Sequence, residues 1–112
     1  MLNNNKYITA LASISIIANT AGVRSTQQLS VFLHCAMKQG RCLADILDLP
    51  SNDPEYRKQL SLVRQLMFGS PARGYNGANV LQWGEKIHGK EKAVILTVKG
   101  QRLFKEALKL LE

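Results

Sequence analysis

The chain has 112 residues, 46% of them hydrophobic, and a net charge of +7. This length predicts one domain, and the hydrophobic content excludes a chain that is disordered throughout. Residues 1–56 carry four basic and four acidic side chains, whereas residues 57–112 carry eleven basic and four acidic ones. A basic half of this kind attracts a polyanion such as nucleic acid, an acidic membrane or an acidic protein, and a lysine-rich solubilising surface is the alternative.

Residues 1–22 predict an amphipathic helix rather than a secretion signal. Polar side chains interrupt the apolar residues, and the first residues are rich in Asn rather than in Lys or Arg. No apolar stretch is long enough to span a bilayer, so the cytoplasm is the expected compartment. Apolar residues recur at helical spacing over residues 5–19, and Gly22 ends the helix. The expected stripe is Tyr7, Ile8, Leu11, Ile14, Ile17 and Ala18.

Three further helices are predicted before residue 69. The first covers residues 25–39, with Ser25 or Thr26 as its N-cap and Gly40 as a left-handed cap at its end. The second covers residues 42–49 and stops at Pro50. The third begins at Pro54 behind the N-cap candidate Asp53. The expected apolar stripes are Leu29, Phe32, Leu33, Ala36 and Met37 in the first; Leu43, Ile46 and Leu47 in the second; and Tyr56, Leu60, Val63 and Met67 in the third.

A β-hairpin and a last helix are predicted after the turn-rich loop GSPARGYNGAN. The β-rich runs VLQWGEKI and KAVILTV, joined by HGKE, predict the hairpin within residues 79–98. Trp83 is expected to anchor it on the core, and stacking of Trp83 and Tyr75 on single-stranded bases is the alternative. Thr97 is the expected N-cap of a helix over residues 98–112, its hydroxyl accepting the Gly100 N–H. Gly100 itself would let the first turn approach neighbouring backbone. The apolar stripe of this helix is Leu103, Phe104, Ala107, Leu108 and Leu111.

Catalysis and metal binding have no support in the sequence. There is no phosphate loop and no nucleophile elbow, so neither an enzyme nor a cofactor is predicted. His34 and His88 do not belong to a cluster with zinc-like spacing. Cys35 and Cys42 are expected to be reduced core residues, and a redox role for the pair is left open.

The order of these elements predicts one winged helix-turn-helix domain over residues 1–112, in the α+β class and mainly α. The N-terminal helix, within residues 1–22, is a candidate dimer element. Residues 25–68 form the expected helix-turn-helix core, residues 79–98 the wing hairpin, and residues 98–112 the C-terminal helix. A helix fits the major groove of DNA, and a basic hairpin beside it can reach phosphates or the minor groove.

The C-terminal half also resembles a known family. LTVKGQRLFKEAL is similar to the junction of wing and last helix in MarR-type regulators, where Leu-Thr-x-x-Gly-Arg is common; the positions here are Leu96, Thr97, Gly100 and Arg102, with Gln101 in between. STQQLSVFLHCAMKQG and CLADILDL resemble the two preceding helices, so the resemblance covers residues 25–112. It implies a dimeric DNA-binding transcriptional regulator, often a repressor, with any effector left open. The chain departs from the pattern at Leu47, where a small Ala is usual, and in the turn at residues 50–53, which lacks Gly.

Carried over by position, the resemblance implies two groups of contacts with double-stranded DNA. The helix that begins at Pro54 has a polar face opposite its apolar stripe, and the hairpin tip is basic. An ordinary solvated surface is the alternative for both. The predicted recognition-helix contacts are Arg57, Lys58, Ser61, Arg64 and Gln65, and the predicted wing contacts are Lys86, His88, Lys90 and Lys92.

A rival function belongs to another class. The same basic surface would serve a winged-helix module that binds an acidic protein, for example as a factor from a mobile element, and the altered turn before Pro54 favours this interpretation. Both proteins would be retained on heparin, but only a DNA-binding protein would give a salt-sensitive shift of duplex DNA.

Overall fold

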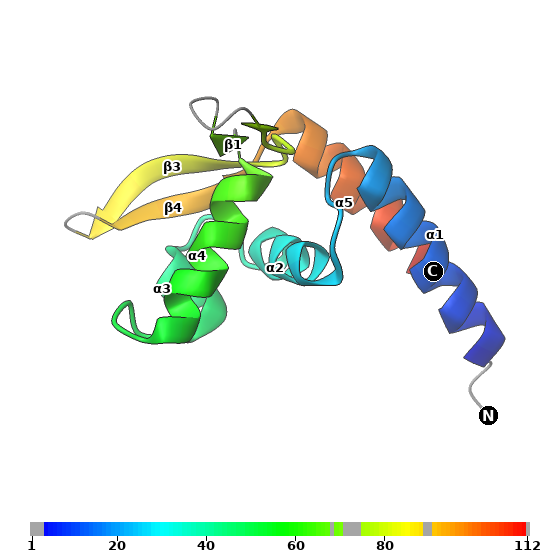
Figure 1. The fold of residues 1–112 in the computed structure, drawn as a ribbon, viewed down its shortest axis with the longest axis horizontal. Helices are drawn as coiled ribbons and strands as arrows, with labels where there is room; N and C mark the ends of the chain where they lie inside the picture. Colours follow the sequence, from blue (N-terminus) through cyan, green and yellow to red (C-terminus); the bar gives the residue numbers. More distant parts are fainter. Residues whose placement is uncertain (1–3, 68, 71–74, 89–90, 112) are drawn as a thin grey trace.

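Five helices and two antiparallel strand pairs form within residues 4–67, 69–70, 75–88 and 91–111, which the computed structural model describes (Figure 1). The helices are α1 (Asn4–Thr20), α2 (Thr26–Met37), α3 (Leu43–Leu47), α4 (Pro54–Leu66) and α5 (Val98–Leu111). The strands are β1 (Gly69–Ser70), β2 (Tyr75–Asn76), β3 (Leu81–His88) and β4 (Glu91–Leu96). The fold is therefore a mainly helical α+β domain in which the hairpin β3–β4 precedes the last helix. Across these described ranges, no helix combines the length and apolarity that a membrane span needs.

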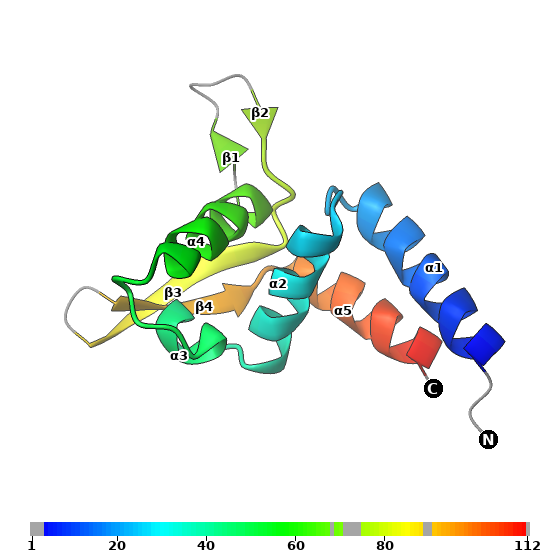
Figure 2. The same ribbon diagram turned by 60° about the horizontal axis from the view of Figure 1, so that its bottom comes forward.

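The predicted helices and hairpin are confirmed in type and order, and their ends differ by a few residues. The predicted loop at 69–79 is wrong in one respect, because β1 and β2 pair within it, Gly69 with Asn76 and Ser70 with Tyr75. Figure 2 shows this short pair projecting away from α4 and β3. A pair of two-residue strands has no room for an alternating pattern, so the sequence carries no signal for it.

Side-chain caps fix where α2, α4 and α5 begin. Ser25 Oγ accepts the Gln28 N–H at 3.0 Å, and Asp53 Oδ1 accepts the Glu55 N–H at 2.8 Å. Thr97 Oγ1 accepts the Gly100 N–H at 3.0 Å, as predicted. Each hydroxyl or carboxylate satisfies an N–H group that has no partner within the helix. These bonds set the starts of α2, α4 and α5.

Among the described residues, Gly22 and Gly40 are the glycines in the left-handed backbone conformation, and of these only Gly22 caps a helix. Gly22 has φ +100° and follows α1, where Val23 N–H donates to the Ala18 carbonyl at 2.8 Å and closes the helix end. The predicted capping role of Gly40 is wrong. Its φ is +91°, but α2 ends at Met37, and the Gly40 N–H donates to the Val94 carbonyl of β4 at 3.0 Å. Gly40 thus turns the chain onto the hairpin.

The segment after Gly40 pairs with the free edge of β4 as a short third strand-like segment, called the third edge of the hairpin. The Val94 N–H donates to the Arg41 carbonyl at 2.9 Å, and Cys42 and Ala93 form an antiparallel bridge. On its other side β4 pairs with β3 from Leu81–Leu96 to His88–Glu91. The base of β4 is consequently held from both sides.

The helices form two groups joined through α2. Helices α1 and α5 pack side by side at one end of the molecule, and the tip of β3–β4 lies at the other end (Figures 1 and 2). Helix α2 contacts α4, β4, α3, α1 and α5 and so lies at the centre. Helix α4 lies beside the hairpin, which places the two basic elements of the sequence next to each other.

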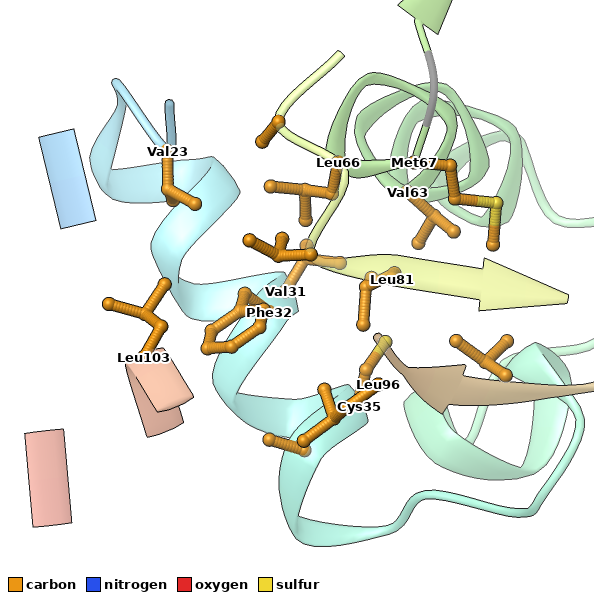
Figure 3. Close-up of a cluster of buried hydrophobic side chains, with 14 of the residues drawn as sticks. Val23, Val31, Phe32, Cys35, Val63, Leu66, Met67, Leu81, Leu96 and Leu103 are labelled. Atoms are coloured by element: carbon orange, nitrogen blue, oxygen red, sulfur yellow. The ribbon is translucent and has the colours of Figure 1, made fainter. Parts of the chain in front are cut away.

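The core lies where α2, α4, the hairpin and α5 meet, and Figure 3 shows its side chains. Cys35 lies within it, as predicted, and Trp83 packs against it, which confirms Trp83 as an anchor of the hairpin. The central, fully buried side chains are Phe32, Cys35, Ile46, Val63, Leu66, Met67, Val80, Leu81 and Val94.

Several apolar residues that were expected in the core are exposed instead. Met37 is 75% exposed, and on α1 the exposed fractions of Ile8 and Leu11 are 63% and 59%. Among the described side chains of α1, only Ala10, Ile14 and Ala18 are buried, because α1 packs on few neighbours besides α5. A wide apolar face on α1 is therefore left without a cover in the monomer.

Residues 78–80, which lie between β2 and β3 in the chain, form hydrogen bonds to both the end of α4 and the start of α5 and are called the junction segment. On the α4 side, the N–H groups of Ala78, Asn79 and Val80 donate to the carbonyls of Gln65, Met67 and Leu66 at 2.6–3.0 Å. On the α5 side, Lys99 Nζ donates to the Ala78 carbonyl and Thr97 Oγ1 to the Asn79 carbonyl, both at 2.7 Å. Gly100 lies so close to Val80 that a Cβ there would overlap the Val80 carbonyl oxygen, which confirms the close approach predicted for this glycine.

Candidate nucleic-acid interface

Helix α4 presents a polar, basic face to solvent. Asp53 and Pro54 start the helix, and its own Val63 and Leu66, together with the following Met67, are buried on its inner side. With this side inward, residues spaced by three and four along the opposite side share one exposed face. The predicted contacts Arg57, Lys58, Ser61 and Arg64 are all exposed on it.

Gln65, the fifth predicted contact on α4, is partly buried and has an internal partner. Its Oε1 accepts the Nε2–H of Gln28 on α2 at 2.7 Å, and Gln28 Oε1 accepts the Arg24 N–H at 2.9 Å. This pair links α4 to α2 and fixes how α4 lies on the core. No signal in the sequence indicates this bond, since the two glutamines are 37 residues apart.

The hairpin places two predicted wing lysines opposite each other. Lys86 of β3 and Lys92 of β4 are cross-strand partners, and both are exposed. The pairing is irregular on either side of Lys86. Like charges directly opposite each other destabilise a strand pair. A bound anion between the two ammonium groups would remove this cost.

The other two predicted wing residues are less well defined. The backbone of His88 pairs with Glu91 at the end of the hairpin, but the His88 side chain lies outside what the structure describes. Lys90 lies outside the described residues altogether.

A cleft of about 400 Å³ lies between α4 and the hairpin, and residues 42–44 at the start of α3, with Ser51 of the turn before α4, complete its lining. It brings together residues that no sequence spacing connects, since Arg64 lies on α4 and Lys92 on β4. Apolar and aromatic side chains form its walls, with two cations and one carboxylate among them. Its lining includes Tyr56, Leu60, Arg64, Trp83, Glu91 and Lys92.

Burial raises the pKa of two groups at the cleft, and the Glu91 carboxylate adds to both shifts. Burial, followed by the Glu91 carboxylate and the Cys42 thiol, raises the pKa of the Tyr56 hydroxyl. Burial is also the main cause that raises the pKa of Cys42, with Glu91 contributing in the same direction. Both groups are therefore neutral near neutral pH, and Arg64, Lys92 and Glu91 carry the charge of the cleft.

Burial raises the pKa of the Cys35 thiol from 9.0 to about 12. Because the thiolate is the reactive form, we expect neither Cys35 nor Cys42 to react with a disulfide reagent such as Ellman's reagent near neutral pH until the protein unfolds. Two thiols per chain should appear in denaturant and almost none without it. Rapid labelling of the folded protein would contradict this prediction.

The raised pKa of Cys35 also means that the thiol stabilises the fold fully below pH 9.0, and that this contribution declines as the pH rises towards about 12.

No group of three His, Cys, Asp or Glu side chains within the described ranges could hold a metal ion. Comparison of the chain with protein-family models, curated proteins and solved structures finds no match.

Proposed function

We propose that the protein is a winged helix-turn-helix regulator of the MarR type that binds double-stranded operator DNA, most simply as a repressor that occupies its site. One observation carries the proposal: the exposed basic face of α4 lies beside a hairpin in which Lys86 faces Lys92. The major groove of duplex DNA accepts a helix, and the phosphates on either side of this groove attract basic side chains.

The fold supports this docking mode. Helices α3 and α4 are joined by a short turn, in which Asp48 adopts the left-handed conformation with φ +55°. Helix α4 would enter the major groove with its exposed face towards the base edges, while α2 and α3 hold it from behind. The hairpin would reach the neighbouring backbone. The third edge from Arg41 to Cys42 stiffens the base of that wing.

A homodimer is part of the proposal, with α1 as its contact. The described outward face of α1 carries no charge, so two copies of a basic protein could meet there without repulsion. A two-fold protein also gains affinity from binding two half-sites at once. The exposed residues of this face are Ile8, Leu11, Ala12, Ser15, Ile16 and Asn19.

The experiment that tests the function is a mobility shift with random-sequence duplex, followed by selection of the bound sequences. We expect a palindrome with half-sites about one helical turn apart. Arg57→Ala should cost about 1–3 kcal/mol and relax the preference at one base pair of each half-site. Lys109→Ala, an exposed change on α5, is the matched control and should leave the preference unchanged.

A parent protein that shifts no duplex even at low salt would contradict this function. Retention on heparin without a duplex shift would then favour an acidic protein as the partner.

A further inference from the structure

Arg64 differs from the other exposed residues of α4 because it faces the hairpin. It lines the cleft between the two elements, and Arg57, Lys58 and Ser61 do not. Lys92 reaches the same cleft from β4. Two cations from separate elements thus converge on one space, although the sequence assigns Arg64 to base readout and Lys92 to the wing.

The backbone at both cations, Arg64 and Lys92, is held in place by its neighbours. Arg64 follows Val63, which is fully buried, and precedes Gln65, which is bonded to Gln28 of α2. Lys92 precedes Ala93, which bridges to Cys42, and Val94, which is bonded to Arg41. The backbone positions of both cations are therefore set before any ligand arrives, so that binding has to order only their side chains.

The chemistry of the cleft suits a phosphodiester. A guanidinium group can hold two oxygens of one phosphate, and an ammonium group adds a point charge from the other side. Trp83 and Leu60 reduce the access of water, which strengthens the attraction. Glu91 is the opposing charge, since its carboxylate lines the same cleft.

We propose that this cleft seats a backbone phosphate of the DNA strand that passes between α4 and the hairpin, held by Arg64 and Lys92 and opposed by Glu91. The inference rests on the proposed DNA-binding function and refines it. A helix in the major groove and a wing beside it must leave room for the sugar-phosphate backbone between them. Arg64 thereby positions the protein, and Arg57, seven residues earlier on α4, is the arginine left to read bases.

The roles of Arg64 and Arg57 can be separated by salt dependence. Each phosphate contact that is lost reduces the slope of log affinity against log salt concentration by about one unit. Arg64→Ala and Lys92→Ala should each weaken binding about 10-fold at low salt, equally for the selected site and a scrambled duplex. Glu91→Gln should strengthen binding to both duplexes about 3-fold, because a like charge is removed.

Arg64→Lys gives a second and independent test. Lysine binds phosphate as a point charge but cannot replace the paired hydrogen bonds of an arginine to guanine. We therefore expect Arg64→Lys to keep most of the affinity and all of the sequence preference. Arg57→Lys should lose sequence preference and serves as the matched comparison.

The measurement is fluorescence anisotropy of labelled selected and scrambled duplexes over a series of NaCl concentrations, with thermal unfolding to verify that each variant is folded. A changed base preference in Arg64→Ala, with an unchanged salt slope, would overturn the phosphate assignment and leave the DNA-binding function intact. A parent protein that binds neither duplex would overturn the function and the phosphate seat together.

Discussion

Gly100→Ala is expected to destabilise the protein by about 3 kcal/mol, although Ala is the better helix former by about 1 kcal/mol. Gly100 lies in the first turn of α5 and is buried, and an added Cβ would overlap the carbonyl oxygen of Val80. Val80 cannot move aside easily. Its side chain is fully buried, its N–H is bonded to Leu66 at 2.8 Å, and its carbonyl accepts the Thr97 N–H at 3.2 Å. The added methyl group therefore forces α5 away from the junction segment.

Urea denaturation of the parent and variant measures this loss. Gly40→Ala is the matched control, because Gly40 has φ +91° but no atom lies within 4 Å of the position that its Cβ would take. It should cost only about 1–2 kcal/mol, the penalty for a side chain in the left-handed conformation. A Gly100→Ala variant as stable as the parent would show that α5 does not begin this close to Val80.

Leu11→Glu is expected to turn the proposed dimer into a monomer and to reduce affinity for a two-half-site operator by about 100-fold or more. Leu11 is 59% exposed and Ile16 67% exposed on the uncharged face of α1. A glutamate there costs the monomer little, because the site is already in water. In a two-fold dimer the same change would bury two like charges near each other.

Sedimentation gives the mass of each form, and binding to duplexes with one or two half-sites gives the affinities. Affinity for a single half-site should stay the same. Gln27→Glu introduces the same charge at an exposed position of α2 and should keep the parent's mass and affinity. The α1 contact would be refuted if Leu11→Glu and the parent had the same mass.

Local signals in the sequence predicted the elements well because each carries its own chemistry. Asp53 before Pro54 marks the start of α4, and Thr97 before Gly100 marks the start of α5, whatever the rest of the chain does. The left-handed conformation predicted for Gly40 is correct, but its predicted role as a helix cap is not. Its N–H donates to Val94, which lies 54 residues further along the chain. Which face of α1 is covered also depends on distant neighbours, and this explains the exposed Ile8 and Leu11.

The candidate site could be predicted only residue by residue. Helical spacing placed Arg57, Lys58 and Ser61 on one face with Arg64 at its flank, and the predicted hairpin grouped Lys86 and Lys92 near its basic tip. The meeting of Arg64 and Lys92 in one cleft depends on how α4 packs against β3 and β4. The bond between Gln28 and Gln65 likewise depends on the crossing of two helices. Neither arrangement leaves a periodic trace in the sequence.

The junction segment has a consequence for how this protein can be divided. Its N–H groups donate to carbonyls at the end of α4, and two of its carbonyls accept hydrogen bonds from the side chains of Thr97, the N-cap of α5, and Lys99. A fragment that ends after β4 would leave those carbonyls and the buried Val80 without their cover. Gly22, at the end of α1, also lies against Ala78. We therefore expect the terminal helices and α4 to unfold in a single cooperative step, so that no shorter fragment of the chain would serve as a minimal binding domain.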